Sequence, residues 1–101
     1  MSDLREQLKE GFGVSDWFDL SPHAARDALI VVHPSLDLLM VGEAIATDNT
    51  PLVSQWMEGT LVRKPTQEEL TVWNRAEAEL MFPALIVQPF VLMSYDAAEQ
   101  I

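Results

Sequence analysis

The two histidines are the side chains of this sequence best suited to acid–base chemistry, because imidazole titrates near neutral pH. His23 follows Asp19 by four residues, a spacing that places a carboxylate and an imidazole on one face of a helix. His33 follows an apolar run, and Asp37 lies four residues after it. One hypothesis is therefore a small-ligand protein or an enzyme that uses His23 or His33 with a neighbouring carboxylate. A local ion pair or an exposed histidine is the simpler interpretation, because neither imidazole has a metal-site partner nearby in the sequence.

The motifs that would complete a catalytic or cofactor site are absent from the sequence. It has no cysteine, which excludes disulfides, zinc–thiolate sites and thiol catalysis. Its four glycines stand apart and form no phosphate-binding loop, and no serine lies in a Gly-x-Ser-x-Gly elbow. An Asp-rich calcium loop is also missing. We therefore expect a non-enzymatic protein without a cofactor or a metal.

Aromatic side chains mark the candidate surface for a protein partner. Trp17 with Phe18, and Trp56 with Met57, lie in segments of amphipathic pattern, where tryptophan belongs to the core or to an interface. Tryptophan anchors partner surfaces more often than most residues do, so these two pairs are where we expect an exposed contact patch. Pro89 interrupts the last apolar run, and proline cannot donate to a strand ladder. It therefore predicts a bulge or an open sheet edge, which can accept a partner's strand or a second copy of the chain.

The segment of residues 42–59 resembles a repressor-type helix-turn-helix. In this alternative, Ser54 and Gln55 read base edges while Arg63 and Lys64 contact phosphates. The turn glycine of such motifs is replaced by threonine, and the stretch that would enter the DNA groove carries no lysine or arginine. A pair of packed helices with similar caps explains the same residues, so a helix-turn-helix regulator is the second interpretation and not the first.

Charge limits the class of partner. The chain has 16 acidic and 6 basic residues, a formal net charge of −10. Because nucleic-acid binding depends on cationic contacts to phosphate, this excess argues against a general DNA or RNA binder. No stretch combines about 20 apolar residues with helical continuity, so we expect no membrane span. The N-terminus lacks the pattern of a secretory signal, which predicts a cytoplasmic protein. The expected partner is a protein with a basic surface, and homodimerisation is a further expectation.

Hydrophobic periodicity and capping residues predict the elements that position these side chains. One helix is expected at residues 3–10, a second after a cap at Ser15, and a third from Leu36 after a cap at Ser35. A fourth is expected at 50–59 with Thr50 as its cap, and a fifth from the capping box Thr66–Glu69 to about Met81. Strands are expected at 28–32, 60–63, 84–88 and 90–93, the last two being either one strand broken at Pro89 or two segments. This order predicts an α/β (α+β) fold with a short sheet of about three strands packed by about four to five helices. Residues 1–101 are expected to form one small compact domain with a frayed tail at 96–101.

An ordered set of segments through most of the chain carries a family resemblance. The segments are Asp27–Val32, Leu36–Leu38, Val41–Asn49, Gln55–Met57, Lys64–Thr66 and Ala84–Leu92. Together they resemble the small bacterial family called domain of unknown function 2288, in the form that cyanobacteria carry. The resemblance implies a short, stand-alone intracellular domain, and it supplies neither an established activity nor catalytic residues. The first function that we expect is thus an acidic binding or adaptor protein that acts by protein–protein contact.

Overall fold

The described part of the chain, residues 3–76 and 80–95 of the computed structural model, forms five α-helices and five β-strands. The helices are α1 (Asp3–Glu10), α2 (Trp17–Ala25), α3 (Leu38–Ala46), α4 (Thr50–Glu58) and α5 (Gln67–Ala76). The strands are β1 (Phe12–Asp16), β2 (Leu29–Val32), β3 (Val62–Arg63), β4 (Met81–Val87) and β5 (Phe90–Ser94). The tail expected at 96–101 lies outside the described residues.

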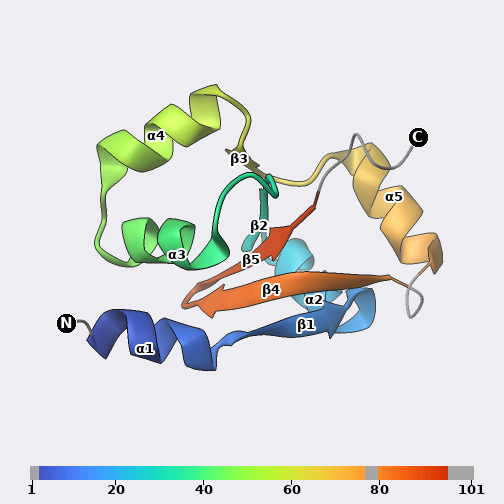
Figure 1. Ribbon diagram of the computed structural model, residues 1–101. Coiled ribbons are helices and arrows are strands. Elements are labelled where there is room, and N and C mark those ends of the chain that lie inside the picture. The colour runs from blue at the N-terminus through green and yellow to red at the C-terminus, as the bar shows by residue number, and fades with distance from the viewer. Residues whose placement is uncertain (1–2, 77–79, 96–101) are drawn as a thin grey trace.

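The strands form one mixed sheet in the order β1-β4-β5-β2-β3 (Figure 1). Neighbouring strands are antiparallel except β2 and β5, which run parallel with Ile30 beside Leu92. Strands β1 and β3 are therefore the edges of the sheet. The expected α/β class is confirmed, but the expected sheet of about three strands is too small. The sequence pattern does not predict β1, and the run interrupted at Pro89 is two strands.

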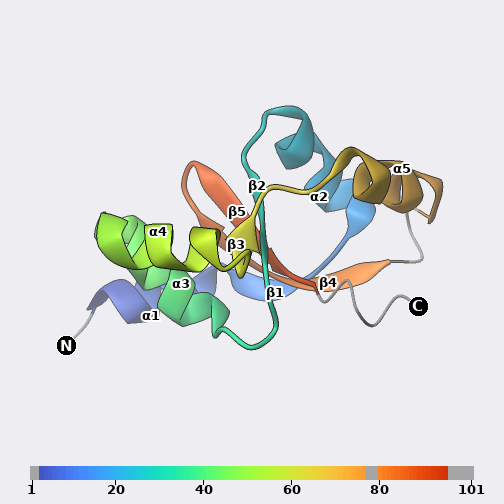
Figure 2. The same ribbon diagram turned by 90° about the horizontal axis from the view of Figure 1, so that it is seen from above.

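The sheet separates two hydrophobic cores, because successive side chains of a strand point to opposite faces. Helices α1, α3 and α4 cover one face, and Leu8, Val41 and Trp56 belong to the core beneath them. Helices α2 and α5 cover the other face (Figure 2), and the core beneath them includes Trp17 and Trp73. The chain therefore folds as a helical layer, a sheet and a second helical layer.

Trp73 lies at the centre of an aromatic cluster that holds α2 and α5 on the second face. Its ring centroid is 5.0 Å from that of Trp17, 5.6 Å from that of Phe82 and 5.0 Å from that of Tyr95. The pairs with Phe82 and Tyr95 are edge-to-face and the pair with Trp17 is tilted, and such aromatic pairs add to the stability that burial alone provides. Trp17 Nε1 donates a hydrogen bond of 2.8 Å to Asn74 Oδ1, so its polar group is satisfied as well.

The capping box predicted at the start of α5 is confirmed. Thr66 Oγ1 accepts a hydrogen bond of 3.1 Å from the Glu69 amide, and Glu69 Oε1 accepts one of 3.0 Å from the Thr66 amide. The predicted end of this helix near Met81 is wrong, because Met81 begins β4. Residues 81–87 alternate between exposed and buried for most of their length, and pairing with β1 and β5 makes them a strand.

Helix α1 begins at its predicted residue, Asp3. Helices α2, α3 and α4 begin within about two residues of their predicted starts, and each of these three has a different cap from the one predicted. Asp16 caps α2 instead of Ser15, and its Oδ1 accepts a 2.9 Å hydrogen bond from the Asp19 amide. Asp37 caps α3 instead of Ser35, with Oδ1 2.9 Å from the Leu39 amide. The start of α4 is capped by the asparagine before Thr50. A carboxylate or amide at the cap satisfies free helical amides as a serine does, so these neighbouring residues are hard to separate by type alone.

Two prolines lie at positions where their missing N–H is tolerated. Pro22 lies inside α2, and the Phe18 carbonyl that it cannot pair with accepts a hydrogen bond of 3.4 Å from Ser21 Oγ. Pro89 follows a cis peptide bond in the turn between β4 and β5. The expectation that Pro89 marks a bulge or an open edge is wrong, because both of these strands lie inside the sheet.

Candidate functional site

An open groove with apolar walls lies between α3, α4, strands β2 and β3, and the β4–β5 hairpin. Its volume is about 260 Å³. We call it the apolar groove, and its apolar lining consists mainly of Ile30, Ile45, Val53, Met57, Val62 and Phe90. These side chains come from five elements, so the groove exists only in the folded chain.

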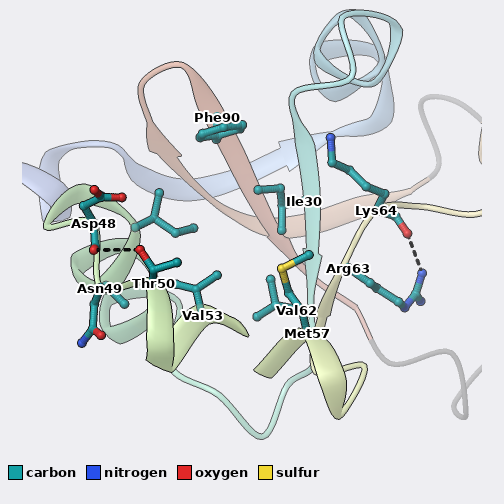
Figure 3. Close-up of a pocket in the computed structure, with 12 residues that line it drawn as sticks. Ile30, Asp48, Asn49, Thr50, Val53, Met57, Val62, Arg63, Lys64 and Phe90 are labelled. Atoms are coloured by element: carbon teal, nitrogen blue, oxygen red, sulfur yellow. Dashed lines mark hydrogen bonds between the residues drawn. The ribbon is translucent and has the colours of Figure 1, made fainter. Parts of the chain in front are cut away.

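Helix and strand periodicity explain how the walls of the apolar groove form. Thr50, Val53 and Met57 are three and four residues apart on α4, so they share one face of the helix. Phe90 alternates with buried Val91 on β5, so it lies on the same sheet face as its neighbour Ile30 on β2. In Figure 3, Ile30 lies between Phe90 and Met57. The sheet thus supplies the floor of the groove and α4 supplies one wall.

The turn between α3 and α4 forms a polar end of the apolar groove. Asp48 adopts a left-handed backbone conformation with φ 59°, and its carbonyl accepts hydrogen bonds of 2.9 Å and 3.3 Å from the Thr50 amide and hydroxyl. The Asn49 side chain caps α4, and the Asn49 amide donates a hydrogen bond of 2.8 Å to the Ala44 carbonyl. The backbone of Asp48 and the polar groups of Asn49 and Thr50 thus make bonds within the turn and to the helix ends.

Two ion pairs form the opposite end of the apolar groove. The Arg63 guanidinium makes two hydrogen bonds of 2.8 Å to the Glu69 carboxylate, and Lys64 Nζ lies 3.1 Å from Asp27 Oδ1. The hydrogen bond with Glu69 raises the pKa of Arg63, although burial acts against it. Burial acts to raise the pKa of Glu69, but hydrogen bonds from Arg63 and from Thr66 outweigh it and hold that pKa below its ordinary value. Both basic residues are therefore occupied by carboxylates.

The chemistry available in the apolar groove is that of apolar contact. Among the side chains that the structure describes, no charged or polar one is buried, and no buried nitrogen or oxygen lacks a hydrogen-bond partner. No group of three or more histidine, aspartate or glutamate side chains in this part of the chain is placed to hold a metal ion. The groove therefore offers apolar surface and shape, without a polar group held inside it.

The candidate partner surface is divided by the fold. Trp17 is 1% exposed and Trp56 is 8% exposed, so the expectation that these tryptophans lie in an exposed patch is wrong; each ring belongs to a core. Phe18 and Met57 are 70% and 55% exposed. Phe18 lies on α2, on the opposite side of the sheet from the apolar groove. Met57 lines the groove, and exposed Pro89 precedes Phe90 at its other wall.

Residues 42–59, the helix-turn-helix-like segment, contain the second half of α3 and all of α4, two helices that pack together. Ser54 and Gln55 are exposed on α4, which contains no lysine or arginine and ends at Glu58. Arg63 and Lys64 are ion-paired as described above. The exposed surface that would face DNA therefore lacks the free cations on which phosphate contact depends.

The histidines lie at separate places in the fold. His23 and Asp19 line one shallow hollow beside β1, but the described residues contain no hydrogen bond between them, and His23 Nδ1 contacts the Arg26 guanidinium. His33 Nδ1 accepts a hydrogen bond of 3.0 Å from the Ser35 amide. Asp37 caps α3. His33 Nδ1 also lies 2.8 Å from Ser35 Oγ, so this histidine contacts both the amide and the hydroxyl of a residue two positions away. Each histidine thus contacts a neighbour within its own local segment.

Of the apolar lining of the groove, only Met57 is a contact residue predicted from the sequence; Arg63 and Lys64 at its end were predicted as nucleic-acid contacts. Ile30 reads as part of a buried strand, and Val53 reads as part of an amphipathic helix. Phe90, directly after a turn-forming proline, carried the one usable signal, since an aromatic residue beside a turn often lies at a surface.

No helix in the described ranges has the length and apolar character needed to cross a bilayer. The fold and the groove together define a small α/β domain with a mixed sheet between two helical layers and an open apolar groove.

The chain belongs to the family of proteins of unknown function DUF2288, whose family model matches residues 3–95. The family predicted from the sequence segments is thereby confirmed. The chain is also similar to the NMR solution structure of PA1075 from Pseudomonas aeruginosa, with 29% sequence identity and a TM-score of 0.77. That similarity covers 100% of this chain and 92% of the other. The comparison with curated proteins found no match.

Proposed function

We propose that this protein is a non-enzymatic cytoplasmic binding or adaptor protein, which holds apolar side chains of a basic protein partner in the apolar groove. The observation that carries the proposal is the groove itself, an open apolar surface that joins the exposed side chain of Met57 to Phe90 and Ile30. Exposed apolar surface in a concave site is typical of interaction sites.

The size and lining of the apolar groove favour protein side chains over a small molecule. Pockets for drug-sized ligands usually hold about 300–1,000 Å³ and contain a few convergent polar groups. The groove holds about 260 Å³, and its polar residues lie at the ends, where they are bonded to one another or to carboxylates. One or two apolar side chains fit this space and need no polar group at its centre.

The charge of the protein supports a basic partner. The formal net charge is −10, and Asp48 lies at one end of the apolar groove. A partner with lysines and arginines around its apolar side chains gains from this field, because opposite potentials raise the rate of encounter. A second copy of the chain would bring two equally acidic surfaces together, so a different protein is the favoured occupant.

Site-specific photo-crosslinking tests the proposal at the groove itself. A photoreactive amino acid replaces Met57 in one variant and Val72 in another, and both variants are expressed in the native host. Val72 is the matched control, because it is 57% exposed, against 55% for Met57, and lies on α5 at the other face of the sheet. We expect a discrete crosslinked protein from the Met57 position and none from the Val72 position.

Binding of the purified crosslinked protein then gives the quantitative test. Met57→Asp should weaken its affinity by about tenfold or more, because a carboxylate would be placed against apolar walls, whereas Val72→Asp should leave it unchanged. Equal crosslinking at both positions, or an affinity that does not respond to Met57→Asp, would contradict the proposal. A crosslink between two copies of the chain would replace the foreign partner with a homodimer.

A further inference from the structure

Strand β1 leaves one side of its backbone unpaired at the edge of the sheet. The Gly11 carbonyl accepts a hydrogen bond of 3.1 Å from the Ile86 amide, and the Trp17 amide donates one of 3.1 Å to the Leu80 carbonyl. Because hydrogen-bonded pairs alternate along antiparallel strands, Gly13 and Ser15 also face β4. The backbone N–H and C=O groups of the alternating residues, which include Phe12 and Val14, therefore point away from the sheet.

One face of this edge is apolar and open. Phe12 and Val14 lie on the same face of β1 and are 48% and 62% exposed. Met81 on β4, in register with Asp16, is 57% exposed on that face as well. The opposite edge, β3, has only two residues, so β1 is the longer free edge of the sheet. Exposed strand edges with apolar side chains are templates for pairing with another strand.

The other face of β1 borders an acidic hollow. A Cβ atom built on Gly13 would meet nothing within 4 Å, so the space above this residue is empty of protein. The hollow holds about 310 Å³ and is lined by Glu10, Asp19 and His23, among others. Among the side chains that the structure describes, Glu10 and Asp19 form no ion pair, while Arg26 contacts the histidine. The side chain of a residue added beside Gly13 would enter this hollow.

We propose that the β1 edge binds an extended segment of another protein in which apolar residues alternate with lysine or arginine. In such a segment the apolar side chains pack beside Phe12 and Val14, and the basic side chains reach the hollow near Glu10 and Asp19. The inference rests on the proposed function in that both require a protein partner, but it uses a surface separate from the apolar groove. Strand addition of this type takes affinity from backbone hydrogen bonds and specificity from alternate side chains.

Charge complementarity selects a foreign basic segment over a second copy of the chain. Pairing β1 with β1 of another copy would bring Glu10, Asp16 and Asp19 of both chains to one junction, and each chain carries a formal net charge of −10. Like charges placed together oppose association, whereas a lysine-bearing strand gains from the same carboxylates.

Hydrogen exchange by NMR on the full chain tests the proposal with a defined probe. The probe is a capped peptide of alternating valine and lysine, long enough to span β1; a valine–glutamate peptide is its control. With the lysine peptide we expect the amides of Phe12 and Val14 to exchange about tenfold more slowly or better, while those of Gly13 and Ser15, already bonded to β4, change little. The glutamate peptide should leave all four amides unchanged.

Two pairs of variants locate the contact. Val14→Pro removes one outward N–H but no bond to β4, and should weaken peptide binding by about tenfold, whereas Val14→Ala keeps the donor and most of the affinity. Glu10→Lys should weaken binding, whereas Glu58→Lys, which makes the same charge change at the end of α4 beside the opposite edge, should not. The charge pair keeps the test valid if Val14→Pro does not fold.

Three results would overturn the inference. The first is unchanged exchange at Phe12 and Val14 with the lysine peptide, and the second is equal binding by Glu10→Lys and Glu58→Lys. The third is protection of the same two amides in the free protein that grows with its concentration, which would assign the edge to a second copy. Failure here with an intact Met57 crosslink would leave the proposed function standing, since that test reads the apolar groove alone.

Discussion

Gly42→Ala is expected to lower the stability of the fold, contrary to the usual effect of this change in a helix. Gly42 is buried at the contact between α3 and the sheet. A Cβ atom at this position would lie 2.7 Å from Leu85 Cδ2 and 3.2 Å from Val87 Cγ2. Optimal carbon–carbon separations are about 3.5–4.0 Å, so the first contact is short by about 1 Å.

The magnitude follows from two opposing contributions. Leu85 is fully buried and Val87 is stiff at χ1, so α3 must move outward or Leu85 must leave its rotamer. Overpacking of this kind costs about 1–3 kcal/mol, and replacing a helical glycine by alanine returns about 1 kcal/mol. We therefore expect the free energy of unfolding to fall by about 1 kcal/mol, with a loss of roughly 5 °C in Tm.

Urea unfolding of a double-mutant cycle with Leu85→Val measures this effect. Leu85→Val removes the Cδ atoms that a new Cβ would touch, so in this background Gly42→Ala should be neutral or stabilising. The coupling energy should be about 1 kcal/mol or more. A gain of about 1 kcal/mol from Gly42→Ala in the wild-type background, or the same loss in both backgrounds, would refute the assigned contact.

Three further predictions concern the Arg63–Glu69 ion pair, the Trp73 core and the negative surface charge. Because the pKa of Glu69 is lowered from 4.5 in the folded state, its bonds with Arg63 stabilise the fold above that pH and are lost as the pH falls through the lowered pKa. Glu69→Gln should thus lower the free energy of unfolding by about 1–2 kcal/mol near neutral pH and by much less near pH 3, as urea titrations at both pH values would reveal. Trp73→Ala should cost about 3–5 kcal/mol, and a denaturation midpoint close to that of the wild type would argue against its central place in the second core. The association rate with the partner should fall as salt rises while dissociation changes less; a flat series would mean that the negative charge serves solubility only.

Elements with local signals were predictable from the sequence. The reciprocal bonds of Thr66 and Glu69 require only residues three apart, so the start of α5 follows from type and spacing. The run of 28–32 contains β2 because continuous apolar and β-branched residues favour a strand buried on both faces. Proline after the cap and glycine at the end likewise predict α4.

Elements that depend on distant partners were not predictable. The segment of β1 contains Gly13 and follows Gly11, both poor strand formers, and it is extended because β4 pairs with it from the other end of the described chain. The same pairing makes Met81 the first residue of β4, although the sequence pattern up to Met81 is typical of a helix. The apolar groove has the same origin, since Ile30, Met57 and Phe90 meet only after the sheet has formed. The exposure of each tryptophan could not be predicted from the sequence either, because amphipathic spacing does not distinguish a core face from an interface face.

The order of the strands has a consequence for how the chain folds during synthesis. Phe12 of β1 pairs with Leu85, and Leu29 of β2 pairs with Val91. Neither strand can therefore form its longer strand pairing until the β4–β5 hairpin has been synthesised. Pairings so far apart in sequence form slowly, and apolar faces of the earlier helices stay uncovered on the ribosome until then. The hairpin therefore completes the sheet. Truncation of the chain before β5 is expected to prevent folding of the whole domain, and not merely to remove one strand from the sheet.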